Sequence, residues 1–470
     1  LLILDWYPFQ RITSLKTFRT SFIEKLPFIA LSIASSILTV LAQKEAIVPM
    51  ELVPLTSRIL VGVESIAGYL WNMLWPVHLT PYYPYPKNVS LLSFEYFGAL
   101  VFVAGLTAVC VIIARRQKLW LAAWGYYTIV LLPVLGIVQV GAQAMADRYT
   151  YLPSLGPFFI AGVVIAWTWS RIEKRRPAAR LSSSIILLGI VACLVYLTSE
   201  QVSVWKNSIE LWSHVIEREP EKVPFAYANR GLAFDRAGQY NRAIEDYDKA
   251  ITLKPSDFEA YNNRGMAYQK IDQFAMAIED FGATIAANPA FYQAYYNRAI
   301  VFEKMSRYDK AVEDYDRTIA LNPSYTEAYN NRGIVFDSMG QYDKAIEDYD
   351  KAIALNPSNF ETYYNLGIVY GKTALLDKAV EAFSRAIAIN PNYPYAYGSR
   401  GLAYFRLGRD DSALNDFNRA LSLDYNYAGA YVNRGKLYLK TGNREPAATD
   451  FQRACSLGDG EGCQALKLTH

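Results

Sequence analysis

Histidine and cysteine are scarce in this sequence of 470 residues. It has three histidines and four cysteines, scattered along the chain, so none of them has the spacing of a zinc site. The formal net charge is only +3, and the basic residues do not gather in one soluble face. We therefore predict no metal site, no cofactor and no nucleic-acid partner.

Charge is distributed unevenly between the two halves of the chain. Residues 1–204 carry 16 Lys and Arg against 9 Asp and Glu, whereas residues 205–470 carry 31 against 35. The front half is apolar with scattered basic residues, and the back half is polar and rich in tyrosine. This contrast and the chain length favour two or more domains and exclude a simple soluble enzyme.

Apolar stretches of about 18 or more residues without charges predict helices that cross a bilayer, because lipid cannot hydrogen-bond an open backbone. Five stretches qualify: 26–43, 96–114, 119–139, 153–170 and 181–199. Residues 1–4 resemble the end of a sixth span, so we expect earlier spans to be missing; they lack the basic start and the apolar length of a signal peptide. We predict a multi-spanning membrane domain over residues 1–204.

Lys and Arg predict the orientation of these spans. Basic clusters occupy residues 11–25, 115–118 and 171–180. All three lie inside only if residues 44–92 form one outer segment, in which residues 57–75 are an interfacial helix. The alternative, a further crossing at 57–75, would invert one cluster. On the preferred topology, the loop 140–152 and everything after Ser199 face the outer side.

The back half repeats itself at intervals of 34 residues. Small residues recur at Gly231, Gly265, Ala299, Gly333, Gly367, Gly401 and Gly435. Alanines recur at Ala243, Ala277, Ala311, Ala345, Ala379, Ala413 and Ala447. Two aromatic series run from Phe234 to Tyr438 and from Tyr247 to Phe451. Prolines close five units, at Pro255, Pro289, Pro323, Pro357 and Pro391.

Each series has a physical role in a pair of antiparallel helices. Small residues let the helices approach, aromatics fill the space between units, and proline ends the second helix. This is the tetratricopeptide repeat pattern. We place seven repeats at 224–257, 258–291, 292–325, 326–359, 360–393, 394–427 and 428–461. Residues 205–223 predict a degenerate half-repeat and junction, and residues 462–470 a C-terminal cap. The predicted fold is all-α, a polytopic membrane domain followed by an α-solenoid.

The first helix of each repeat is expected to line the concave side of the solenoid. One position there is asparagine in six repeats, with Ser399 as the exception: Asn229, Asn263, Asn297, Asn331, Asn365 and Asn433. A carboxamide offers a donor and an acceptor, so such a ladder can hold an extended polypeptide. The alternative, of equal weight, is that these residues satisfy helix ends. The arginine that follows in most repeats is expected to pair with acidic residues of the second helices.

Cys455 and Cys463 are eight residues apart across the turn into the cap, and an outer compartment would permit a disulfide between them. The segment around them also resembles Sel1-type repeats, which implies a bridge. Cys110 and Cys193 fall in predicted spans, where we expect inert packing.

The loop 143–153, QAMADRYTYLP, is the most suggestive part of the front half. It places Asp147, Arg148, Tyr149 and Tyr151 between two predicted spans at the outer surface. An arginine at that depth is costly without an anionic partner. A simple Asp147–Arg148 pair with interfacial tyrosines is the structural alternative.

This run is similar to one in the transmembrane-and-tetratricopeptide-repeat family of protein O-mannosyltransferases and their bacterial relatives. So are residues 4–8, LDWYP, residues 24–28, EKLPF, and the arginine at position 58. The resemblance implies a C-type glycosyltransferase that moves a sugar, mannose above all, from a polyprenyl-phosphate carrier to protein Ser or Thr. It also implies an integral protein of a bacterial inner membrane, with the repeats on the periplasmic side.

The resemblance also implies site residues. Arg148 would offset the carrier phosphate, with Tyr149 or Tyr151 donating hydrogen bonds. Asp147 and Arg58 are further candidates for the lipid carrier, and Lys25 is a weaker one on the inner side. The family's catalytic base lies in a first outer loop that would precede Leu1, so no catalytic residue is assigned.

Two functions therefore compete. One is a glycosyltransferase whose repeats bind the acceptor polypeptide, and the other is a non-enzymatic membrane-tethered scaffold. A pure anchor needs one span and no polar outer loop, which favours the enzyme. A transporter is a distant third, because charges that would mark an ion path are missing from the spans.

Overall fold

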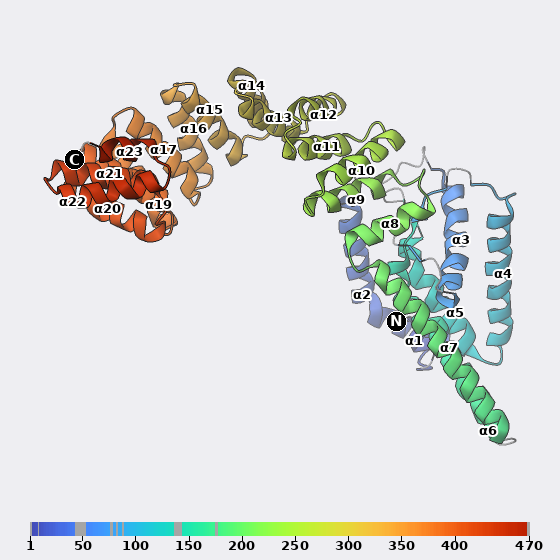
Figure 1. Ribbon diagram of the computed structural model, residues 1–470. Helices are drawn as coiled ribbons and strands as arrows, with labels where there is room; N and C mark the ends of the chain where they lie inside the picture. The colour runs from blue at the N-terminus through green and yellow to red at the C-terminus, as the bar shows by residue number, and fades with distance from the viewer. Residues whose placement is uncertain are drawn as a thin grey trace. The chain divides into compact units, whose positions relative to one another are not determined.

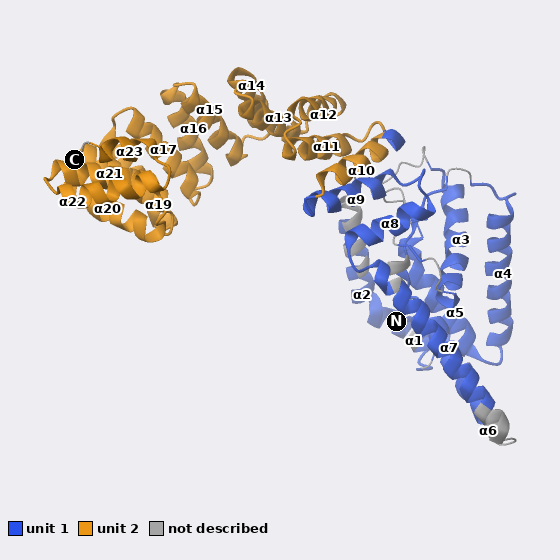
Figure 2. Ribbon diagram, viewed as in Figure 1, with its two compact units in different colours: residues 1–238, 252–254 blue, residues 239–251, 255–470 orange. Residues whose placement is uncertain are grey.

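The computed structural model describes residues 2–7, 9–42, 53–75, 79–80, 83–86, 89–135, 143–173 and 177–467 (Figure 1). The chain divides into two compact units (Figure 2). The first comprises residues 1–238 with 252–254, and the second residues 239–251 with 255–470.

The first unit is helical apart from one short pair of strands. Its α-helices are α1 (Leu2–Trp6), α2 (Leu15–Ala42), α3 (Leu55–Leu74), α4 (Phe94–Ala114), α5 (Lys118–Leu131), α6 (Leu155–Glu173), α7 (Pro177–Val204), α8 (Ser208–Arg218) and α9 (Pro224–Arg236). Two short 3₁₀ helices are η2 (Leu132–Val134) and η3 (Asp147–Thr150). The strands β1 (Tyr83–Pro84) and β2 (Gln143–Met145) pair antiparallel.

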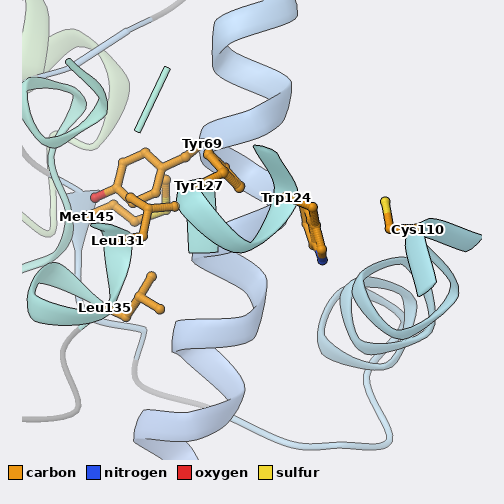
Figure 3. Packing of buried hydrophobic residues seen from close by; sticks show 7 residues of the cluster. All are labelled: Tyr69, Cys110, Trp124, Tyr127, Leu131, Leu135 and Met145. Carbon is orange, nitrogen blue, oxygen red and sulfur yellow. The ribbon is translucent and has the colours of Figure 1, made fainter. Parts of the chain in front are cut away.

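The core of the first unit lies where α3, α4 and α5 pack (Figure 3). Tyr69, Tyr127 and Leu131 are completely buried there. The Tyr127 hydroxyl donates to the Ile66 carbonyl at 2.7 Å, and the Tyr69 hydroxyl accepts from the Ala146 backbone N–H at 3.0 Å. Because a buried hydroxyl needs a partner, these bonds fix α5 and the segment after β2 against α3.

Two of the described helices are long and apolar enough to cross a membrane: α4 and residues 182–204 of α7. The stretch 119–139 begins as α5, which ends at Leu131, and Pro133 then lies in η2. Residues 43 and 136–139 of the predicted spans lie outside the described residues. The five-span domain and its orientation stay predictions.

The segment predicted as an interfacial helix forms α3, whose inner side belongs to the core. Arg58, Ser65 and Tyr69 are buried on it, whereas Trp71 and Trp75 are 64% and 55% exposed. The two tryptophans are thus available to an interface, and whether α3 lies on a membrane stays a prediction.

The second unit consists of α-helices in consecutive antiparallel pairs, a tetratricopeptide solenoid. They are α10 (Tyr240–Leu253), α11 (Phe258–Lys270), α12 (Phe274–Ala287), α13 (Tyr292–Lys304), α14 (Tyr308–Leu321), α15 (Thr326–Ser338), α16 (Tyr342–Leu355), α17 (Phe360–Lys372), α18 (Leu376–Ile389), α19 (Pro394–Arg406), α20 (Asp410–Leu423), α21 (Ala428–Lys440), α22 (Arg444–Ser456) and α23 (Gly460–Leu466). Each helix packs on the next in the chain from α11 onward, and α23 covers α21 and α22.

Small residues on the first helices set the close approach within each pair. A Cβ on Gly333 would lie 2.7 Å from a ring carbon of Tyr349, and one on Gly367 2.6 Å from Phe383. Any larger residue would displace these buried rings. The first helices also contact one another, α15 to α17 and α17 to α19 among them, so they form the inner side of the solenoid.

Candidate functional site

At least five of the described first helices carry an arginine that binds an aspartate sixteen residues later, on the second helix of its own repeat. In the third repeat, Arg298 Nε and Nη2 donate to the two carboxylate oxygens of Asp314, both at 2.8 Å. Asp314 is only 4% exposed. The equivalent pairs are Arg264–Asp280, Arg332–Asp348, Arg400–Asp416 and Arg434–Asp450.

Aromatic rings contact all five of these arginines, and the preceding repeat supplies a further acceptor to most of them. Arg264 Nη1 also donates to Asp248 of the preceding second helix, at 2.5 Å, and Arg332 does the same to Asp316. Each guanidinium lies over two rings of its own helix, as Arg298 does over Tyr295 and Phe302 at 5.9 Å. Burial raises the pKa of Asp280, Asp314 and Asp348, and the arginine hydrogen bonds oppose that rise. The arginines thus hold the array together, as their spacing predicts.

The fifth repeat lacks this pair. Leu366 and Ala382 occupy the two positions, are 6% and 5% exposed, and belong to one apolar cluster. Asp350, which matches Asp248 and Asp316, therefore faces a leucine, and burial raises its pKa. Replacing both partners of a buried ion pair by apolar groups leaves no unpaired charge, which is why the change is tolerated.

The predicted asparagine row lies half-buried on the inner side. Asn297 Nδ2 donates to Asn262 Oδ1 at 3.1 Å, Asn331 Nδ2 to the Tyr296 hydroxyl at 3.0 Å, and Asn365 Nδ2 to Asn330 Oδ1 at 3.4 Å. Each bond joins one first helix to the preceding one. Asn229 instead donates to the Phe225 carbonyl of its own helix.

Part of the carboxamide capacity in this row is unused within the described chain. Asn263 and Asn433 make no hydrogen bond there, and the acceptor oxygens of Asn297 and Asn365 are unoccupied. The residue 35 positions earlier explains this pattern, because it is Ala228 for Asn263 and Gly398 for Asn433, which offer no polar side chain. The row therefore links neighbouring first helices through side chains, which differs from the predicted role at helix ends, and it keeps free acceptors. Whether it holds a polypeptide stays a prediction.

Sequence reasoning missed a basic row at the ends of the first helices. It consists of Arg236, Lys270, Lys304, Lys372, Arg406 and Lys440, all exposed. Cations are favourable at helix C-termini, and the 34-residue spacing was a visible signal. Lys372 pairs with Asp337 at 2.7 Å and Lys440 with Asp410 at 2.6 Å. Arg236 contributes to a groove of about 390 Å³ between α8 and α9, together with Trp212 and Asn229.

The candidates in the front half are distributed over several environments. Arg58 is 2% exposed and donates through Nε to the Val53 carbonyl at 2.9 Å. Tyr149 packs beside the core, whereas Tyr151 is 78% exposed. Lys25 lies 3.3 Å from buried Asp5. The side chains of Asp147 and Arg148 lie outside what the structure describes.

A disulfide joins Cys455 on α22 to Cys463 on α23, with the two Cα atoms 4.6 Å apart. Of the other cysteines, Cys110 is buried and Cys193 is exposed. Within the described ranges, no group of three or more His, Cys, Asp or Glu could hold a metal ion.

Comparison with known families identifies the back half. Tetratricopeptide repeat models match residues 231–272, 335–373, 376–408 and 401–442, residues 292–325, residues 314–347, and residues 258–291 and 428–457. The C-terminal half of the chain is a tetratricopeptide repeat array. These matches begin at residue 231, and nothing in the comparisons supports the resemblance to O-mannosyltransferases. No curated protein matches the chain.

Several solved structures are similar to this array. A tetratricopeptide repeat protein from Parabacteroides merdae ATCC 43184 is 24% identical over 52% of this chain and 98% of its own, with a TM-score of 0.43. MamA is 31% identical over 34% and 94%, with a TM-score of 0.33. YrrB, described as a TPR protein with an unusual peptide-binding site, is 26% identical over 40% and 99%, with a TM-score of 0.35.

Proposed function

We propose that the tetratricopeptide array is a non-enzymatic scaffold that holds an extended segment of a partner polypeptide along its first helices. The unused acceptors of the asparagine row carry this proposal. The arginines are consumed by ion pairs within the array, but Asn263, Asn297, Asn365 and Asn433 keep oxygens that can accept backbone N–H groups. An extended segment offers such donors along its whole length.

Photocrosslinking in the full chain tests this proposal. A benzophenone side chain replacing Gln269 on α11 is expected to capture a polypeptide, and one replacing exposed Glu347 on α16 is not. The paired substitutions Asn263→Ala and Asn433→Ala should reduce capture at least fivefold. Asn392→Ala, in an exposed turn between repeats, is the matched control. Equal capture from both helices, or capture unaffected by the paired substitutions, would refute binding of a polypeptide along the first helices.

We further propose that the front half tethers the array to a membrane, with the array on an oxidising side, as in a bacterial periplasm. Only 6% of the apolar window of α4 is buried, and none of that in residues 182–204 of α7, although both helices are apolar and α4 contributes Cys110 to the core. The disulfide between Cys455 and Cys463 favours an oxidising compartment, because structural disulfides are rare where thiols are kept reduced. Alkaline phosphatase fused after residue 467 should be active and fused after Arg116 inactive; the reverse pattern would overturn this orientation.

The glycosyltransferase remains the competing hypothesis, and its test uses a lipid-linked sugar. Membranes containing the chain, with any upstream coding sequence restored, are incubated with radiolabelled polyprenyl-phosphate mannose. We expect no transfer to protein above that of membranes lacking the chain. Transfer that is lost in Arg148→Ala would overturn the non-enzymatic scaffold and restore the predicted donor site.

A further inference from the structure

The inner side of the array departs from its own repeat pattern at the junction of the fifth and sixth repeats. Position 371 is glycine, whereas the same position is Asp235, Gln269, Glu303 or Asp337 in the earlier repeats and Phe405 or Leu439 in the later ones. Position 399 is serine, where the other repeats have asparagine. Both departures place a shorter side chain than any other repeat has there, on the neighbouring helices α17 and α19.

The two departures leave a pocket of about 230 Å³ between α17, α18 and α19. Its lining includes Ile368 and Leu402 on the walls and the buried ring of Phe383. A Cβ built on Gly371 would meet no atom within 4 Å, so the space above this glycine is open. A pocket of this size is below the roughly 300–1,000 Å³ of small-molecule sites, which suits one side chain.

A cation stands at the mouth of this pocket. Arg406 Nη1 donates to the Gly371 carbonyl at 2.9 Å, which holds the guanidinium beside the opening. A guanidinium has five N–H donors, so most of them are left for a carboxylate. The neighbouring Lys372 is occupied by Asp337, at 2.7 Å. Arg406 is thus the cation positioned to accept a new anionic partner.

We propose that this pocket binds one aliphatic side chain of the partner polypeptide, and that Arg406 pairs with an Asp or Glu next to it in the partner sequence. The apolar lining favours the aliphatic side chain, and the guanidinium of Arg406 favours the carboxylate. This inference rests on the proposed polypeptide-binding function and adds a sequence preference to it. The asparagine row holds backbone, whereas this pocket distinguishes one side chain from another.

Selection of peptides on the full chain tests the preference. A phage library of random dodecapeptides is selected on the protein in detergent micelles, and enriched sequences are synthesised with a fluorescein label for anisotropy titration. We expect an aliphatic residue beside Asp or Glu in most of them. Replacing that aliphatic residue by alanine, or the acid by its amide, should weaken binding at least tenfold.

Three variants assign the binding to this pocket. Gly371→Gln restores the side chain that the second repeat carries at this position, and the open space above Gly371 allows it without strain. Ser399→Asn restores the repeat pattern from the facing helix, and Arg406→Gln removes the charge. Each should weaken the selected peptides at least tenfold, while Lys351→Gln, on the exposed side of α16, should change binding less than twofold.

The outcomes separate the two levels of the proposal. If the selected peptides bind Gly371→Gln and Arg406→Gln as tightly as the wild type, side-chain recognition by the pocket is refuted, whereas polypeptide binding by the array is retained. Enriched sequences without the aliphatic–acidic pair would do the same. Failure to select any peptide on a correctly folded full chain would overturn both.

Discussion

The buried arginine–aspartate pair, in the repeats that have it, predicts a large energetic coupling that single substitutions would misrepresent. In the third repeat, Arg298→Leu leaves Asp314 buried without a partner, because that carboxyl is only 4% exposed. Breaking a buried pair in this way costs about 3 kcal/mol. Asp314→Ala leaves Arg298, whose side chain is 23% exposed and reaches water, so the loss is about 1–2 kcal/mol.

The double variant Arg298→Leu/Asp314→Ala reproduces the fifth repeat, where Leu366 and Ala382 occupy these positions. Since no unpaired charge remains, we expect its loss to be within about 1 kcal/mol, and a coupling energy of about 3 kcal/mol between the two sites. Hydrogen exchange of the slowest amides in α13 and α14 measures the local opening free energy.

An exposed pair is the matched control for this cycle. Arg409 and Asp377 lie 3.0 Å apart with side chains 52% and 74% exposed, and Arg409→Leu should change local stability by no more than about 1 kcal/mol. The reasoning fails if the double variant loses as much as the sum of its single variants. Such additivity would mean that Arg298 and Asp314 contribute independently.

Four further changes have expected outcomes. Ala374→Gly should stabilise the array by about 1 kcal/mol in thermal unfolding, because Ala374 has a φ of +59° where four repeats have glycine. Gly282→Asp should raise the local stability of the array by up to about 1 kcal/mol, because it gives Arg298 a second acceptor. Hydrogen exchange in α13 measures this gain. Burial raises the pKa of Glu303, so its stabilising contribution is present at acid pH and lost as pH rises through that pKa; Glu303→Gln should be more stable relative to the wild type at pH 7.5 than at pH 4. Cys463→Ser should lower the stability of the terminal helix by about 2–3 kcal/mol, seen as faster exchange confined to α22 and α23.

The repeat pattern predicted the packing of the array because packing is set by residues that every repeat shares. Gly333 against Tyr349 is such a case, since every repeat has Gly or Ala at the first position and Tyr or Phe at the second. The hydrogen bonds of the asparagine row could not be predicted in the same way. Asn297 donates to Asn262 and Asn331 donates to Tyr296, so the acceptor comes from a position whose residue varies between repeats.

The front half was less predictable, for a different physical reason. Apolar composition is equally suited to a helix that crosses lipid and to one that packs in a core. Residues 57–75 illustrate this: α3 buries Tyr69 and exposes Trp71, and its sequence alone did not separate these two sides. The loop motif around Asp147 predicted a donor site from its polar residues and above all from a resemblance, and a resemblance between short motifs does not by itself establish chemistry.

Two pairs of positions that depart from the 34-residue period have opposite consequences. Leu366 and Ala382 depart together and join one apolar cluster, so that departure is repaired by packing. Gly371 and Ser399 depart together and leave a cavity instead. Packing alone would favour filling such a space, since an empty apolar cavity forfeits contacts on every side. A cavity that faces the inner side, with Arg406 at its mouth, regains those contacts only when a partner side chain enters. Selectivity for a partner side chain is therefore expected at the junction of the fifth and sixth repeats, where the array leaves a space that its own side chains do not fill.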